Sequence, residues 1–238
     1  MSDFNIGFVI FPGITQLDFT GPFEVLSRIG TPASVSEPSR FAQSKTHVVA
    51  KSMLPVTSDR GLTFMPSCTF DDCPKFDLIC VPGGAGVADA VEDAETVAFI
   101  RRQAAQATYI TSVCVGAFLL GAAGLLQGRR ATTHWAFCDL LPLIDATHEP
   151  SRIVRDGNIF TAGGVTAGID FALLIVAELA GLDVAEAIQL AIEYDPSPPF
   201  NAGSPESAPD EATRLILHRN AQAKIRLKQA LAKASPPA

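Results

Sequence analysis

Residues 109–126 of this 238-residue chain read YITSVCVGAFLLGAAGLL. Tyr109 to Val113 is rich in aromatic and β-branched residues and predicts a buried strand. Val115 to Leu126 is apolar throughout and predicts a buried helix. Cys114 lies at the junction, with Gly116 two positions later. A strand that turns sharply into a helix at a reactive side chain is a nucleophile elbow. The stretch therefore predicts an α/β sheet with a cysteine at its carboxyl edge.

The rest of the chain alternates short apolar runs with longer amphipathic ones, which is typical of a mostly parallel sheet flanked by helices. Further strands are expected at 6–11, 47–50 and 77–81, and at 152–154 and 158–161 as a hairpin turning at Asp156-Gly157. Helices are expected from Thr20-Gly21-Pro22 through Ile29, with Pro22 in the first turn, and at 92–106, 167–179, 184–192 and 210–234.

Residues 195–209 contain five prolines and no apolar period, so they predict a loop or a linker. The chain after Pro209 holds one basic helix and a tail, too little for a second domain. We therefore expect a single α/β domain over residues 1–205 and a C-terminal helical extension over residues 206–238. The basic helix could attract anionic partners, but a solvated helix end is the simpler interpretation.

The composition excludes several classes of protein. Hydrophobic residues make up 47% and charged residues 18%, which is too apolar for a disordered chain. The net charge of −7 argues against DNA or RNA as the main partner. No targeting segment is recognised, and no apolar stretch is long enough to span a membrane. Five cysteines without a C-x-x-C pair, and four scattered histidines, predict a reducing, cytoplasmic location and no metal or other cofactor.

Cys114 is the strongest candidate for chemistry. The helix start beneath it should stabilise a thiolate and lower the pKa of the thiol. The alternative is a buried structural cysteine, the usual fate of this residue type. The other four cysteines lack a helix-start position and are interpreted as structural. They are Cys68, Cys73, Cys80 and Cys138.

Two further segments should meet Cys114 at the carboxyl edge of the sheet, where ligands bind in open α/β folds. The loop 82–86 (PGGAG) comes after a predicted strand, and backbone N–H groups around Gly83, Gly84 and Val115 could hold an anion. It lacks the Lys-Ser/Thr of a P-loop, so a plain glycine turn is the alternative. Asp18 stands between Leu17 and Phe19, an unusual position for a solvated carboxylate. It is either an N-cap near Pro22 or an acid held near the thiol.

These segments, in this order, resemble the DJ-1/PfpI superfamily and, within it, the isocyanide hydratase (isonitrile hydratase) family. The matching stretches are QLDFTGPFEVL at 16–26, FDLICVPGGAGV at 76–87, the run 109–141, the run 155–179 and EYDPSPPFNAGSP at 193–205. The resemblance implies a flavodoxin-like fold of the class I glutamine amidotransferase type, a homodimer and no metal. It also implies hydration of isocyanides to N-substituted formamides through a covalent thioimidate, with Cys114 as nucleophile and Asp18 as its acid partner.

The resemblance bears on five further residues. The hydratase pattern has a threonine where this chain has Val115, which cannot donate a side-chain hydrogen bond to the sulfur. His134 matches a histidine near the cysteine of several DJ-1-like proteins, and it either activates the sulfur or is tied into the start of the next helix. Thr166 and Asp170, with Gly168, either frame the pocket or cap the helix at Ala167, and Asp170 could orient His134.

Two other functions remain open from the sequence. A DJ-1-like stress protein would use Cys114 as a redox sensor or in a glyoxalase or deglycase reaction on aldehydes. A regulator of the AraC type would carry helix-turn-helix units, whereas this chain has only a short helical tail after Pro209.

Overall fold

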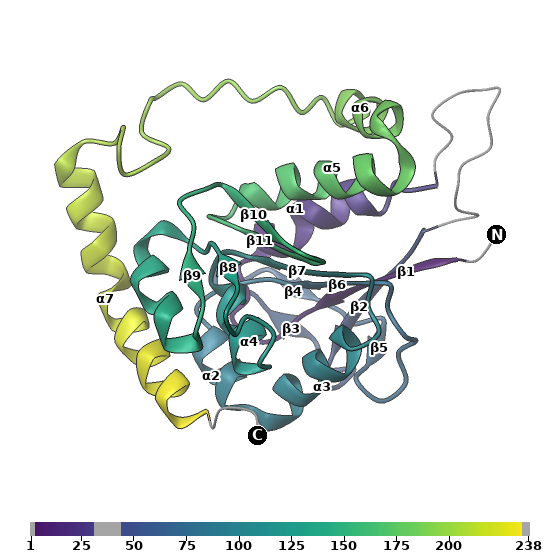
Figure 1. The fold of residues 1–238 in the computed structure, drawn as a ribbon, viewed down its shortest axis with the longest axis horizontal. Coiled ribbons are helices and arrows are strands. Elements are labelled where there is room, and N and C mark those ends of the chain that lie inside the picture. Colours follow the sequence, from purple (N-terminus) through teal and green to yellow (C-terminus); the bar gives the residue numbers. More distant parts are fainter. Residues whose placement is uncertain (1–2, 31–43, 235–238) are drawn as a thin grey trace.

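The structure, a computed structural model, describes residues 3–30 and 44–234. A seven-stranded sheet in the order β10-β11-β7-β6-β1-β2-β5 lies between two layers of helices (Figure 1). Neighbouring strands run parallel except β10 and β11, which are antiparallel. The predicted mostly parallel sheet flanked by helices is confirmed. Its strands are β1 (Phe4–Val9), β2 (Ser44–Ala50), β5 (Cys68–Thr69), β6 (Leu78–Val81), β7 (Tyr109–Val113), β10 (Ile153–Asp156) and β11 (Ile159–Ala162).

The two helical layers bury the sheet on both faces, as its continuous apolar strands require. On one face lie α1 (Gln16–Leu26) and α5 (Ala167–Ala180), with α6 (Leu182–Ala191) packed on α5. On the other lie α2 (Val87–Glu92), α3 (Ala94–Ala104) and α4 (Ala117–Ala122). Outside them, α7 (Asp210–Lys233) packs against α2 and the 3₁₀ helix η2 (Trp135–Ile144). Each of the three layers contributes a fully buried phenylalanine to the core: Phe8 from β1, Phe118 from α4 and Phe171 from α5.

Two predicted helices have other bounds. α1 begins at Gln16 rather than near Pro22. Thr15 holds the N-cap position, and its carbonyl accepts the Asp18 N–H. Pro22 therefore lies inside the helix, not in its first turn. The predicted helix 115–126 is a 3₁₀ turn at Cys114–Gly116 that leads into the short α4. It ends early because Gly124 takes a left-handed φ of +78°.

Several elements went unpredicted, and among them the two-residue strands carry too little alternation to be recognised. The unpredicted elements are β3 (Val56–Thr57) paired with β4 (Thr63–Phe64), β8 (Arg130–Ala131) paired with β9 (Thr147–His148), the edge strand β5, and the helices α2 and η2. The predicted hairpin is confirmed, with Gly157 at a φ of +64° in its turn. Residues 195–209 form neither helix nor strand and arch from α6 to α7 (Figure 1).

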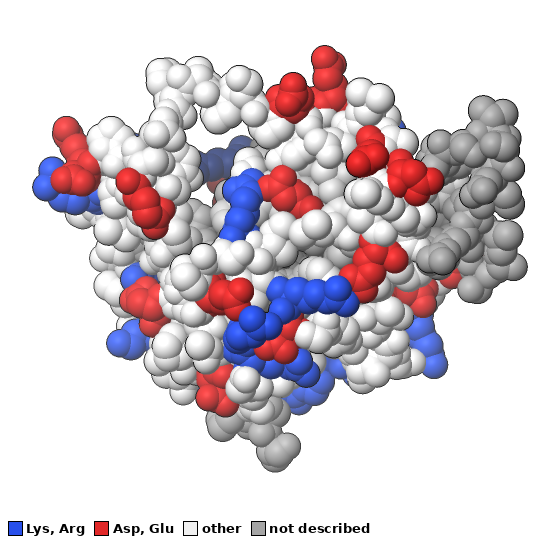
Figure 2. Space-filling view, turned by 45° about the horizontal axis from the view of Figure 1, so that its top comes forward, with Lys and Arg blue, Asp and Glu red and all other residues white. Residues whose placement is uncertain are grey.

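The basic helix α7 is matched by acidic side chains of this chain. Its apolar side packs Leu227 and Leu231 into the core, while Arg226 bonds both Asp89 and Glu92 of α2. On the face in Figure 2, several basic side chains gather near the centre, with acidic side chains beside and among them. These contacts favour the interpretation of α7 as a packed, solvated helix. In the described ranges, no helix has the length and apolar character that crossing a membrane demands.

Candidate active site

Cys114 comes directly after β7 and has a φ of +57°, a left-handed conformation that is strained for a residue with a Cβ. Two hydrogen bonds hold it there. Its N–H donates to the Gly163 carbonyl at 2.8 Å, and its own carbonyl accepts the Thr133 hydroxyl at 2.7 Å. The residue is only 6% exposed. The predicted cysteine elbow at the carboxyl edge of the sheet is confirmed.

The glycine loop after β6 passes closer to the elbow than any other residue type would allow. A Cβ on Gly83 would lie 2.7 Å from the Val115 nitrogen, 2.9 Å from Asp18 Oδ2 and 3.0 Å from the Cys114 Cβ. The Gly83 N–H donates to Asp18 Oδ2 at 3.0 Å, so it holds the carboxyl rather than a free anion. Gly84 has a φ of +129° and forms an isolated antiparallel bridge with Ile14. The loop thus brings Asp18 and Cys114 together.

Asp18 lies in the first turn of α1 and its side chain is fully buried. The N-cap alternative is wrong, because Thr15 holds that position and the Asp18 side chain points to Gly83. Its Oδ1 atom has no hydrogen-bond partner among the described residues. Burial raises the pKa of Asp18 to about 7, although the Gly83 N–H and the Cys114 thiol both act in the opposite direction. A carboxyl with this pKa can give or take a proton near neutral pH.

The pKa of the Cys114 thiol is raised well above its ordinary value. Burial is the main cause and the charge of Asp18 the next, while the Val115 N–H acts against both. The expectation that the helix start lowers this pKa is wrong. The elbow leads into a three-residue 3₁₀ turn, and the N–H groups there do not offset burial beside a carboxylate. A thiol with a raised pKa needs a neighbouring base to form a thiolate, and Asp18 is the carboxyl beside it.

His134 is tied into the start of the next helix. It holds the N-cap position of η2, and its Nδ1 accepts the Ala136 N–H at 3.2 Å. Burial lowers the pKa of the imidazole, which favours the neutral ring. Among the residues that the structure describes, its side chain makes no hydrogen bond to Cys114. The structural interpretation of His134 is confirmed.

Asp170 does not orient His134, because both of its oxygens are engaged elsewhere. Oδ1 accepts the Tyr194 hydroxyl at 2.7 Å, and Oδ2 accepts the Arg152 Nε–H. Arg152 also donates to the hydroxyl of Thr166, at 3.0 Å. Thr166 precedes α5 at the N-cap position but makes no side-chain cap bond.

Arg152 and Tyr194 were not predicted as site residues. The Arg152 carbonyl accepts the Gly163 N–H at 2.9 Å, and the Gly163 carbonyl accepts the Cys114 N–H. The hydrogen bonds of Asp170 to Arg152 and Tyr194 therefore support the segment at Gly163 that binds the Cys114 N–H. The only sequence signal was that Tyr194 falls within a stretch that carried the family resemblance.

Comparison with known proteins agrees with this geometry. A profile of the DJ-1/PfpI family matches residues 5–178. The chain belongs to the DJ-1/PfpI family. It is 54% identical over 214 residues to the isonitrile hydratase of Pseudomonas putida, covering 88% of this chain and 89% of that protein. A crystal structure of a THiJ/PfpI family protein from Pseudomonas syringae superimposes with a TM-score of 0.89 at 42% identity, covering 97% of this chain and 91% of the other.

A more distant relative bears on the regulator alternative. The HTH-type transcriptional regulator GbdR of Pseudomonas aeruginosa is 29% identical over 195 residues. This match covers 80% of this DJ-1/PfpI chain but only 51% of the regulator. The likeness therefore reflects the DJ-1/PfpI domain.

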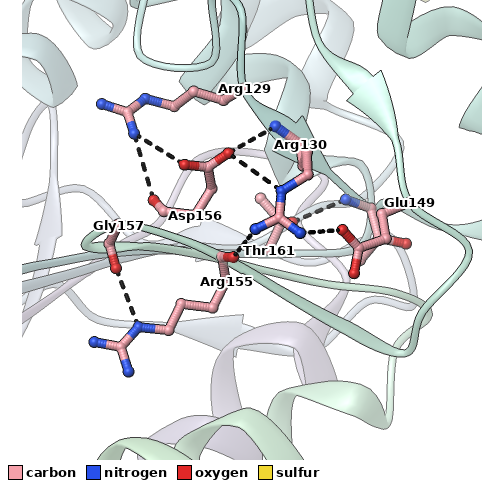
Figure 3. Close-up of polar contacts among 8 residues, drawn as sticks. Arg129, Arg130, Glu149, Arg155, Asp156, Gly157 and Thr161 are labelled. Atoms are coloured by element: carbon pink, nitrogen blue, oxygen red, sulfur yellow. Dashed lines mark hydrogen bonds and ion pairs between the residues drawn. The ribbon is translucent and has the colours of Figure 1, made fainter.

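In this DJ-1/PfpI chain, a polar network fixes the β10–β11 hairpin (Figure 3). Gly163 directly follows β11, at the end of the strand away from the hairpin turn. The Asp156 carboxylate accepts the Arg130 backbone N–H at 2.9 Å and also contacts the Arg129 guanidinium. Arg130 in turn bonds Glu149 at 2.7 Å and the Arg155 carbonyl at 3.1 Å. The network joins the hairpin to the segments on either side of η2. It therefore helps to fix the strand that ends behind Cys114.

The remaining cysteines have the surroundings of structural residues. All five are free thiols. Burial raises the pKa of Cys80 to about 12 and that of Cys68 to about 11, and it also raises the pKa of Cys73 and Cys138. The raised pKa does not distinguish these thiols from Cys114, but of the five cysteines only Cys114 has the left-handed φ of the elbow. Within the described ranges, no group of three or more His, Cys, Asp or Glu side chains could hold a metal ion.

Proposed function

We propose that this DJ-1/PfpI protein is a hydro-lyase that hydrates isocyanides to N-substituted formamides, with Cys114 as nucleophile and Asp18 as acid and base. The observation that carries the proposal is the buried Asp18 carboxyl beside the Cys114 thiol, with a pKa of about 7. The 54% identity to an isonitrile hydratase over most of both chains supports the substrate class. A carboxyl–thiol pair of this kind suits an uncharged substrate that must be protonated at carbon.

The first half of the reaction forms a thioimidate. The sulfur of Cys114 attacks the terminal carbon of the isocyanide, which is electrophilic, while the thiol proton moves to the Asp18 carboxylate. Asp18 then delivers this proton to the same carbon. The product is S–CH=N–R, and Asp18 is a carboxylate again. The Val115 N–H, which lowers the pKa of the thiol, stabilises the sulfur as its charge develops.

The second half adds water. Asp18 takes a proton from water, whose oxygen attacks the thioimidate carbon, and the nitrogen receives that proton. The hydroxyl of this adduct loses its proton to Asp18 as the carbon–sulfur bond breaks. The N-substituted formamide leaves, and Asp18 returns the proton to the Cys114 sulfur. One water is added to one isocyanide, and no redox step is involved.

Three further properties belong to this proposal. We propose a homodimer, as the family resemblance implies, and a cytoplasmic location, which the five free thiols support. We also propose residues 1–205 as the catalytic domain and 206–238 as an extension. The buried residues Leu227 and Leu231 fasten this extension to the domain.

The test is a panel of alkyl and aryl isocyanides and of α-oxoaldehydes, assayed with the wild type and with Cys114→Ala. Formation of the N-substituted formamide is measured by chromatography. We expect isocyanide turnover by the wild type and none by the variant. Turnover of aldehydes without turnover of any isocyanide would overturn the proposal in favour of a glyoxalase or deglycase reaction.

A further inference from the structure

The turn between β3 and β4 holds a carboxylate against the start of α1, the helix that carries Asp18. Asp59 lies in this turn, and its Oδ2 accepts the Thr15 hydroxyl at 2.7 Å. The Asp59 N–H donates to the Ile14 carbonyl at 2.9 Å. A third bond, from the Ser58 hydroxyl to Gln16 Oε1 at 2.9 Å, holds the same turn against the start of α1. The position of Asp59 is therefore fixed from both sides, even though the residue is exposed.

A short chain of hydrogen bonds leads from Asp59 to the catalytic pair. Thr15, which binds the Asp59 carboxylate, donates its N–H to the Gly83 carbonyl at 3.0 Å. Gly83 in turn donates its N–H to Asp18 Oδ2 at 3.0 Å. Only two residues thus separate the two carboxyl groups along this path. The turn is thus joined to the Asp18 carboxyl by hydrogen bonds through Thr15 and Gly83.

The charge of Asp59 is not neutralised by a basic partner. In the part of the chain that the structure describes, neither Asp59 nor Asp18 forms an ion pair, and the neighbouring Arg60 pairs with neither. The Asp59 charge raises the pKa of both Asp18 and Cys114. The other titratable group coupled to Asp18 is the Cys80 thiol on β6, which is neutral. Negative charge at the site is therefore uncompensated.

We propose that Asp59 is a specificity-determining residue, whose fixed charge disfavours anionic electrophiles and leaves uncharged ones as substrates of Cys114. Like charges repel over a distance set by the local dielectric and by salt, so an electrophile that carries a carboxylate pays an electrostatic penalty near Cys114. An alkyl or aryl isocyanide carries no charge and meets no such penalty. The inference rests on the proposed function for the substrate class that it names.

Two alkylating agents of similar size test the proposal. Iodoacetamide is neutral and iodoacetate is an anion, and both react with the same thiolate, so the ratio of their rate constants is independent of the thiolate fraction. The rates are measured at Cys114 by peptide mass spectrometry, at one pH and at low ionic strength. Asp59→Asn removes the charge and keeps an oxygen that can accept the Thr15 hydroxyl. Asp145→Asn is the matched control, because Asp145 is exposed and its left-handed φ of +55° suits asparagine.

We expect the preference for iodoacetamide to fall about two- to fivefold in Asp59→Asn, the size of one screened unit charge near a protein surface, and to stay unchanged in Asp145→Asn. Added salt should bring the wild-type ratio toward that of Asp59→Asn. Asp59→Ser, a second neutral variant that can accept a hydrogen bond, should show the same fall if Asp59→Asn folds poorly. An unchanged ratio in a folded Asp59 variant, or an equal fall in the control, would overturn the inference. Absence of isocyanide turnover would instead count against the proposed function alone, since these probes do not depend on it.

Discussion

The Tyr194 hydroxyl donates to Asp170 Oδ1 at 2.7 Å and ties the chain just after α6 to the first turn of α5. Arg152 bonds the other Asp170 oxygen, and its carbonyl accepts the N–H of Gly163. Gly163 then accepts the Cys114 N–H at 2.8 Å. Tyr194, which lies outside the sheet, is thus linked to Cys114 through Asp170, Arg152 and Gly163.

Tyr194→Phe should therefore affect turnover as well as stability. Removal of one hydrogen bond should lower the free energy of unfolding by about 1 kcal/mol. Tyr109→Phe is the matched control, because the Tyr109 hydroxyl also donates to a carboxylate, Glu178, at 2.8 Å. We expect urea unfolding to give similar losses for both variants, and kcat to fall several-fold in Tyr194→Phe only. Equal kcat values in the two variants would show that Tyr194 has only a structural role.

Gly83→Ala should move Asp18 away from Cys114. The added Cβ would be forced against the Val115 nitrogen and Asp18 Oδ2, so the loop must move and the Gly83–Asp18 hydrogen bond must lengthen. Such overpacking destabilises proteins by about 1 to 3 kcal/mol. We expect kcat/KM to fall at least tenfold, measured beside Gly203→Ala, whose Cβ would meet no atom within 4 Å. A Gly83→Ala enzyme with wild-type kcat/KM would show that the close approach is not required.

Much of this site could be predicted from local sequence. The run 109–113, the cysteine after it and the glycines at 83 and 84 determined where the elbow and its neighbouring loop lie, because these features depend on adjacent residues. The predicted start of α1 is wrong because it depends on adjacent residues alone. Pro22 is a strong local signal for a first turn, but α1 begins at Gln16 and packs against α5, with Gly21 close to Ile169.

The electrostatics of the site could not be predicted from the sequence. The position of Cys114 at a helix start indicated a lowered pKa, whereas burial beside Asp18 raises it. Burial depends on elements brought together from distant parts of the chain. The same holds for the partners of Asp170, since Arg152 and Tyr194 are 18 and 24 residues away from it.

The pKa of Asp18 predicts the pH dependence of turnover. The thiol pKa lies well above the ordinary value, so at neutral pH the thiol is protonated and the form able to react has Asp18 as a carboxylate. Since Asp18 becomes a carboxylate as the pH rises through about 7, kcat/KM should rise through the same range. This apparent pKa belongs to the coupled pair. A pH profile of kcat/KM checks it, and activity that is highest near pH 5 would contradict it.

Asp18→Asn should abolish most turnover and change the pH dependence of stability. Loss of a general acid and base typically lowers rates roughly 10² to 10⁴-fold. The folded-state pKa of about 7 exceeds the ordinary 3.8, so Asp18 favours folding most below pH 3.8 and loses that contribution as the pH rises through 7. The loss is on the order of 4 kcal/mol by linkage. The Tm of Asp18→Asn relative to wild type should therefore increase from pH 4 to pH 8 in calorimetry. A variant that keeps more than about a tenth of the wild-type rate would exclude Asp18 as the proton donor.

Val115→Thr tests the position where this chain departs from the hydratase pattern. Val115 is buried next to the cysteine, and only its backbone N–H lowers the pKa of the thiol. Threonine has nearly the shape of valine and adds a hydroxyl that can donate to the sulfur or to a charged intermediate. A hydrogen bond to a charged group is worth roughly 1.5 to 3 kcal/mol, and about 1.36 kcal/mol corresponds to a tenfold change in rate. We therefore expect kcat for an isocyanide to rise about tenfold or more, together with a lower thiol pKa in a pH series of iodoacetamide labelling. Val184→Thr, at a buried valine of α6, controls for the general effect of a buried hydroxyl and should leave both quantities unchanged. If Val115→Thr leaves kcat and the pKa unchanged, the backbone N–H of residue 115 alone stabilises the sulfur.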